Sequence, residues 1–123
     1  MNDLAKGLEY LRLKQKPLLE KIGHNNIEPD TLARYGLALQ IEISEFVNET
    51  GWKIWKKKPA DLSRVREEMA DVLAFFGVWM LLLDRMGITV EELAEEYDRK
   101  NQINHDRFDG KVEDYGLPPG PAK

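Results

Sequence analysis

The chain has 123 residues, of which 18 are basic and 22 acidic, so its formal net charge is −4. This length fits a single domain with a modest core, and the acidic balance argues against a general nucleic-acid binder. The absence of cysteine excludes a disulfide framework, a cysteine-based zinc site and a cysteine nucleophile. Together with an N-terminus too polar for a signal peptide, it suits a cytoplasmic protein.

The first half of the chain predicts two helices. Residues 3–22 carry leucines at helical spacing, and Pro17 inside this pattern is expected to kink or split the helix. A second helix is expected over 30–50, starting just after a proline and ending before Gly51. The segment "KKKPAD" that follows predicts a charged turn.

The second half predicts two more helices. One is expected to begin at a cap at Asp61 or Ser63 and to run to Met86 before a terminal glycine. The next opens with a capping-box pattern at Thr89 and fades near Asn104, leaving 106–123 as an extended tail rich in Gly and Pro. No strand pattern is present. The expected fold is an all-α bundle of four or five helices in one domain, residues 1–123.

The third of these helices contains a long apolar run. In residues 72–83 the indole of Trp79 is the only polar side-chain group, but the run is too short for a membrane span of about 20 residues. A helix that is apolar all round must be surrounded, which one small chain does incompletely. We therefore expect a homo-oligomer, with Phe75, Phe76 and Trp79 shared between core and interface. The alternative is a central helix in a monomer.

Carboxylates stand beside the apolar surface on two of the helices. Glu68 and Asp71 are three residues apart, so they face the same way at the head of the apolar run. Glu42, Glu45 and Glu49 form a similar band on the second helix, among apolar neighbours. Like charges this close destabilise a helix, and more so when they are partly buried.

Three interpretations of these acids are open. A solvated acidic face is the commonest, although it fits Glu45 and Glu68 poorly, and ion pairs with Arg64 or Lys53 are the second. The third is a metal site, because two facing carboxylate pairs form an all-oxygen ligand set that suits Mg²⁺ or Mn²⁺. A di-iron site is disfavoured because such sites use Glu-x-x-His pairs, which this sequence does not place among its acids.

Longer stretches carry a family resemblance. "EISE" at 42–45 and "EEMAD" at 67–71 resemble the paired Glu-x-x-Glu and Glu-x-x-Asp motifs of the all-α nucleoside triphosphate pyrophosphatases, the MazG-like superfamily. "EISEFVNETGWKIWKKK" resembles the Trp-Lys-x-Trp segment of the dimeric dUTPases, and "YDRKNQINHDRFDGKVEDYG" resembles their C-terminal Lys-Asn-x-x-Asn-x-x-Arg element. The opening helix, with Gln15, is also similar. Pro17 and the compact chain depart from the family pattern.

The resemblance implies hydrolysis of dUTP to dUMP and pyrophosphate, and acceptance of dUDP, with Mg²⁺ as cofactor and Mn²⁺ as a substitute. The implied metal ligands are Glu42, Glu45, Glu68 and Asp71. Glu45 is expected to orient the attacking water. The implied phosphate contacts are Lys100, Asn104 and Arg107. The implied nucleoside contacts are Gln15, Asn48, Trp52, Trp55, Asn101 and Tyr115.

Three functional hypotheses follow. The first is a dUTP diphosphatase, assembled as a homodimer or tetramer, with a nucleotide as its partner and no membrane or nucleic acid. The second is a MazG-like pyrophosphohydrolase for another or a modified nucleotide, which shares the metal site and differs in the base pocket. The third is a non-enzymatic helical dimerisation module, which predicts no Mg²⁺ binding.

Overall fold

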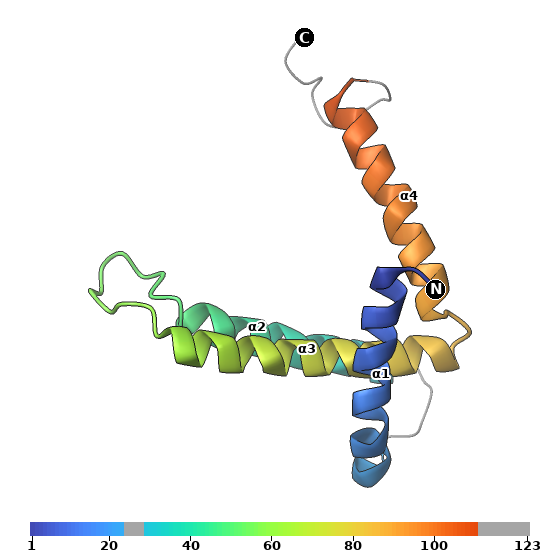
Figure 1. Ribbon diagram of the computed structural model, residues 1–123. Helices are drawn as coiled ribbons and strands as arrows, with labels where there is room; N and C mark the ends of the chain where they lie inside the picture. The colour runs from blue at the N-terminus through green and yellow to red at the C-terminus, as the bar shows by residue number, and fades with distance from the viewer. Residues whose placement is uncertain (24–28, 111–123) are drawn as a thin grey trace.

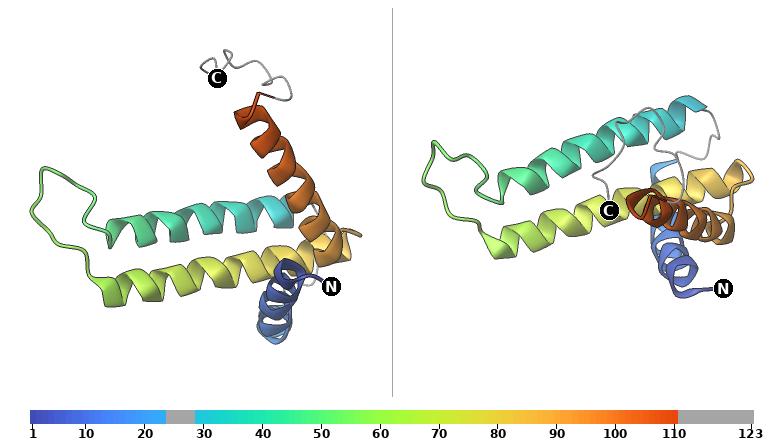
Figure 2. Two further views of the ribbon diagram at one scale, coloured as in Figure 1. Left: turned by 45° about the horizontal axis from the view of Figure 1, so that its top comes forward. Right: turned by 90° about the horizontal axis from the view of Figure 1, so that it is seen from above.

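The structure, a computed structural model, describes residues 1–23 and 29–110. Within these residues the fold is all-α, as the sequence predicts. The helices are α1 (Asp3–Ile22), α2 (Pro29–Asn48), α3 (Leu62–Arg85) and α4 (Val90–Phe108). Helices α2 and α3 run side by side, α1 crosses α3, and α4 leaves from the far end of α3 (Figures 1 and 2).

Side-chain caps set the helix starts. The side chains of Asn2, Asp61 and Thr89 each accept a hydrogen bond from the backbone N–H three residues further on. Such bonds satisfy backbone donors that have no partner inside the helix. The expected starts at Asp61 and Thr89 are thus confirmed. At its other end α3 stops before Gly87, whose φ of 94° is favourable for glycine alone.

The structure differs from the sequence expectations at three places. Helix α1 continues through Pro17 and is not split, because the proline lies on the exposed face, where the carbonyl that loses its partner can reach water. Helix α2 ends at Asn48, before the expected residue 50. Helix α4 continues to Phe108, so 106–108 are helical, and the remaining tail, 111–123, lies outside the described residues.

The core is built around the second half of α3. Buried side chains from α1 and α3 form its centre, and partly buried side chains of α2 and α3 pack against them. These residues are Leu19, Val78, Leu81 and Leu82, with Leu32, Tyr35 and Trp79 packed against them. The indole N–H of Trp79 donates to the carbonyl oxygen of Leu32 at 3.0 Å, which joins α3 to the beginning of α2. Trp79 therefore contributes to the core of the single subunit, while Phe76 is 36% exposed.

Helix α1 lies very close to α3 at Gly77. A Cβ atom at this position would lie 2.6 Å from the carbonyl oxygen of Leu11 and 2.6 Å from Cγ of Gln15, so only glycine permits the crossing. Arg12 also reaches Asp84 at 3.8 Å across the same contact. Since α1 covers the second half of α3, the first half of α3 and the end of α2 extend beyond it (Figure 1).

Helix α4 packs against α1 and is bent by 107° from α3 (Figure 1). Of the described helices, none is by itself long and apolar enough to cross a membrane. Helices α3 and α4 have the length and composition of a membrane span only when the two are counted as one segment, and they are bent relative to each other.

Candidate metal centre

Three carboxylates from two helices meet where α2 and α3 extend beyond α1. Glu42 of α2 and Glu68 and Asp71 of α3 each offer an oxygen atom, and these atoms all lie within 4.8 Å of one another. The two α3 residues share a face because they are three residues apart. Pairing α3 with α2 then brings Glu42 opposite them.

Two oxygen atoms of this triad (Glu42, Glu68 and Asp71) are buried without a hydrogen bond. Glu68 is only 9% exposed, and neither its Oε2 nor Oε2 of Glu42 has a hydrogen-bond partner among the described residues. Buried carboxylate oxygens are nearly always hydrogen-bonded, paired or bound to a metal. The all-oxygen donor set therefore fits a hard divalent cation such as Mg²⁺.

The electrostatics of the triad point the same way. Burial raises the pKa of Glu68, and the negative charges of Glu45 and Asp71 raise it further, against a lowering by Arg64. Burial is also the main cause that raises the pKa of Glu42, followed by the charges of Glu45 and Asp71. The charged forms of both carboxyl groups are thus disfavoured in the metal-free protein. Either protonation or a bound cation would relieve the repulsion.

Glu45 lies beside the triad and has a different environment. Its side chain is exposed, so the solvated-face interpretation, which the sequence disfavoured for Glu45, does describe it. Its negative charge helps to raise the pKa of Glu42, because the two carboxyl groups lie close together. Glu45 therefore lies on the solvent side of the triad, in which Glu68 is buried, Glu42 half-buried and Asp71 exposed.

The ion-pair interpretation is right for one of its two candidates. A guanidinium nitrogen of Arg64 lies 3.6 Å from Glu49 and 3.7 Å from Oε1 of Glu68. The arginine side chain is half exposed, so these pairs are weak, and Oε2 of Glu68 is left without a partner. Lys53 instead lies over the ring of Trp52, 5.7 Å from its centroid.

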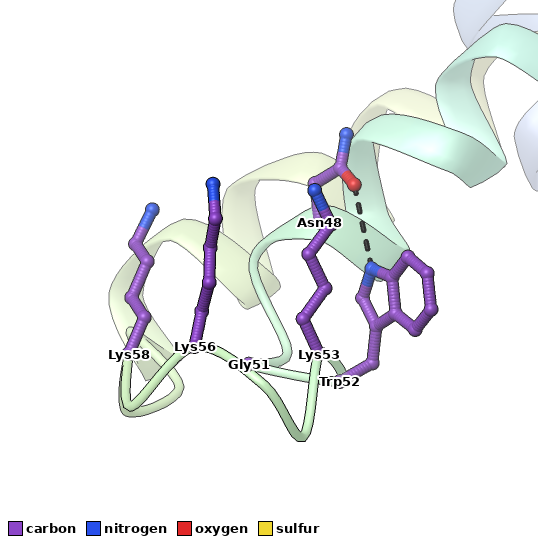
Figure 3. A pocket seen from close by; sticks show the side chains of 6 residues that line it. All are labelled: Asn48, Gly51, Trp52, Lys53, Lys56 and Lys58. Atoms are coloured by element: carbon purple, nitrogen blue, oxygen red, sulfur yellow. Dashed lines mark hydrogen bonds between the residues drawn. The ribbon is translucent and has the colours of Figure 1, made fainter.

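Part of the expected nucleoside set gathers at the loop after α2. The indole N–H of Trp52 donates to Oδ1 of Asn48 at 3.5 Å (Figure 3). The ring of Trp55 meets that of Trp52 edge-on, with centroids 5.6 Å apart. Gln15 lies elsewhere, in the contact of α1 with Gly77.

The expected phosphate contacts lie away from the triad within one chain. Lys100, Asn104 and Arg107 are all on α4, where Arg107 donates to Asn104 at 3.4 Å. The expected nucleoside contact Asn101 is on the same helix. Between Asp71 and the end of α3 the helix rises by about 21 Å, and α4 then turns away (Figure 1). Tyr115 lies outside the described residues.

A family model described as dUTPase matches residues 7–81. This match covers well over half of the chain and includes Glu45 and all three triad residues. The chain belongs to the dUTPase family. No curated protein and no solved structure matches it. The all-α fold and the membership of this family agree with the resemblance drawn from the acidic motifs.

Within the part that matches the dUTPase family, the structure also gathers three lysines for which the sequence analysis gave no ligand, although it named Lys53 as an ion-pair candidate. Lys53, Lys56 and Lys58 line a hollow of about 240 Å³ in the loop between α2 and α3 (Figure 3). The sequence predicts only a charged turn here, because the direction of each lysine depends on how the loop folds back. The sequence feature that could have indicated this arrangement is Gly51, the glycine before the lysines, whose φ is 66°.

Proposed function

We propose that this member of the dUTPase family is a single-domain cytoplasmic enzyme that hydrolyses dUTP to dUMP and pyrophosphate and also accepts dUDP. The observation that carries the proposal is the facing triad of Glu42, Glu68 and Asp71, with two buried oxygens that lack partners. A family match alone leaves the substrate open, and the carboxylates supply the chemistry that a triphosphate substrate requires.

Glu42, Glu68 and Asp71 would hold Mg²⁺, for which Mn²⁺ is a chemically similar substitute. When bound, Mg²⁺ neutralises phosphate charge and lowers the pKa of a coordinated water. Glu45 is exposed and lies close to Glu42, a position that suits orienting the attacking water and accepting its proton. We assign this catalytic role to Glu45 and count it as a further ligand.

The nucleoside contacts in the proposal rest on different grounds. Asn48 lies three residues after Glu45 at the end of α2 and accepts a hydrogen bond from the indole N–H of Trp52, so we expect a nucleotide held at the triad to reach both. The other assignments rest on the resemblance to dimeric dUTPases. They are Gln15, Trp55, Asn101 and Tyr115 for the nucleoside, and Lys100, Asn104 and Arg107 for the phosphates.

A homodimer is part of the proposal. Leu62, Met69, Leu73 and Phe76 are all at least 36% exposed and lie on one side of α3 at helical spacing. An apolar stripe of this length on a small protein marks an interaction surface. A second copy that covers the stripe would complete the burial that the apolar run of α3 requires.

A screen of all common ribonucleoside and deoxyribonucleoside triphosphates with Mg²⁺, following pyrophosphate release, tests the substrate. We expect dUTP to have the highest kcat/KM and chelation of Mg²⁺ to stop the reaction. Fastest release from another nucleotide would replace dUTP with that substrate and support the MazG-like alternative. No release from any nucleotide would support the structural module.

A further inference from the structure

The hollow in the α2–α3 loop is formed by a backbone that folds back on itself. Gly51 has φ of 66°, and a Cβ atom there would lie 2.5 Å from the carbonyl oxygen of Lys58. The N–H of Asp61 donates to the carbonyl oxygen of Glu49 at 3.2 Å and closes the neck of the loop. The hollow is therefore a folded feature of the loop, with a volume of about 240 Å³.

The polar side chains that line this hollow are hydrogen-bond donors towards a ligand. Lys53, Lys56 and Lys58 each carry an ammonium group, and Figure 3 shows the three side chains extending from the loop to the same side. Oδ1 of Asn48 accepts the indole N–H of Trp52, which leaves the amide nitrogen of Asn48 as a donor. No carboxylate is among the lining residues, so the hollow favours an anion.

The tryptophan at the hollow is already engaged by other groups. One face of the Trp52 ring is covered by the ammonium of Lys53, and the Trp55 ring approaches Trp52 edge-on. On that face a nucleobase would meet the ammonium group, whereas a phosphate would gain from it. The contacts thus favour a phosphate group over a base on the Lys53 side of the Trp52 ring, and the nucleoside contact expected of Trp52 falls to the rest of the ring.

The hollow also lies near the carboxylates, on the same helix. Asn48 is six residues after Glu42, about 9 Å along the axis of α2. Glu45 lies between them on the wheel at about 100° per residue, so the three side chains follow one continuous side of the helix. A polyphosphate chain bound through a cation at the triad can therefore extend towards the lysines.

We propose that Lys53, Lys56 and Lys58 bind the terminal phosphates of the nucleoside triphosphate, the part that leaves as pyrophosphate. This inference rests on the proposed function for its place in the reaction. When the bond between the α-phosphorus and the bridging oxygen breaks, that oxygen leaves with pyrophosphate, and the water oxygen takes its place on the α-phosphorus. The ammonium groups stabilise the negative charge on the departing pyrophosphate.

Binding of inorganic pyrophosphate in Mg²⁺-free buffer tests the site apart from turnover. Isothermal titration calorimetry should show binding to the wild type, unchanged binding to Lys57→Ala, and at least about 10-fold weaker binding to Lys53→Ala/Lys56→Ala/Lys58→Ala. Lys57 is the matched control because it belongs to the same loop but does not line the hollow. No binding to the wild type, or equal binding to the triple variant, would overturn the proposal.

Loss of the Lys53–Trp52 contact in the triple variant could disturb the loop. The double variant Lys56→Ala/Lys58→Ala keeps Lys53 and so controls for that effect. With Lys53 retained, pyrophosphate binding should still weaken several-fold and circular dichroism should match the wild type. In kinetics with the best nucleotide of the screen, KM should rise in the double variant but not in Lys57→Ala. A wild type that binds pyrophosphate but hydrolyses no nucleotide would refute the enzyme and leave the anion site standing. An active wild type whose double variant has unchanged pyrophosphate affinity and KM would refute the anion site alone.

Discussion

Replacing Glu68 with Gln is expected to lower kcat/KM for the nucleotide by more than about 100-fold, since a bound Mg²⁺ contributes several kcal/mol of transition-state stabilisation. Asp71→Asn should have a similar effect because both residues belong to the triad. Steady-state assays of pyrophosphate release measure the change. Glu67→Gln is the matched control, since Glu67 is the exposed neighbour of Glu68 and is outside the triad. Full activity of Glu68→Gln would contradict the proposed metal site.

We do not expect unfolding to cause the loss of activity in Glu68→Gln, because the pKa values of Glu68 and Glu42 are raised in the folded protein. Because the pKa of Glu68 and that of Glu42 are higher in the folded protein, the folded state binds more protons above the ordinary pKa of 4.5. The free energy of unfolding of the metal-free protein therefore falls as pH rises from the ordinary pKa through the raised pKa values of the folded state. Glu68→Gln removes one of the charges. Metal-free Glu68→Gln should be at least as stable as the wild type at neutral pH, and its stability should depend less on pH in thermal unfolding.

The wild type is expected to sediment at micromolar concentration with twice the mass of the 14.2 kDa chain. The exposed stripe of α3 is the physical reason, because apolar surfaces of this kind resemble a domain core cut in half. Leu73→Glu places a charge in the middle of the stripe, which is costly to bury, and should give monomer or aggregate. Glu67→Lys, on the other side of α3, should remain a dimer. A wild type that is a well-folded monomer would contradict the homodimer.

Much of the fold and of the acidic site is encoded locally. The caps at Asp61 and Thr89 and the spacing of apolar residues predict the helices within a few positions. Glu68 and Asp71 share a face by helix geometry alone, so their proximity could be read from the sequence. The split predicted at Pro17 is absent, because the effect of a proline on a helix depends on whether its face of the helix meets solvent.

The remaining features depend on tertiary arrangement. The exposure of Glu45 follows from how α2 lies against α3, which a single-helix wheel does not fix. The separation of Lys100 from the carboxylates follows from the 107° bend between α3 and α4. The gathering of the loop lysines follows from the backbone turn at Gly51, which local sequence indicates only as a turn.

Thermal unfolding of the wild type and of Glu68→Gln during a Mg²⁺ titration tests the metal site most directly. A cation that binds only the folded state raises the melting temperature with concentration, because binding adds RT ln(1 + [L]/Kd) to the free energy of unfolding. We expect millimolar Mg²⁺ to raise the melting temperature of the wild type and to leave that of Glu68→Gln unchanged. No shift in the wild type, even with a non-hydrolysable dUTP analogue present, would contradict the metal site.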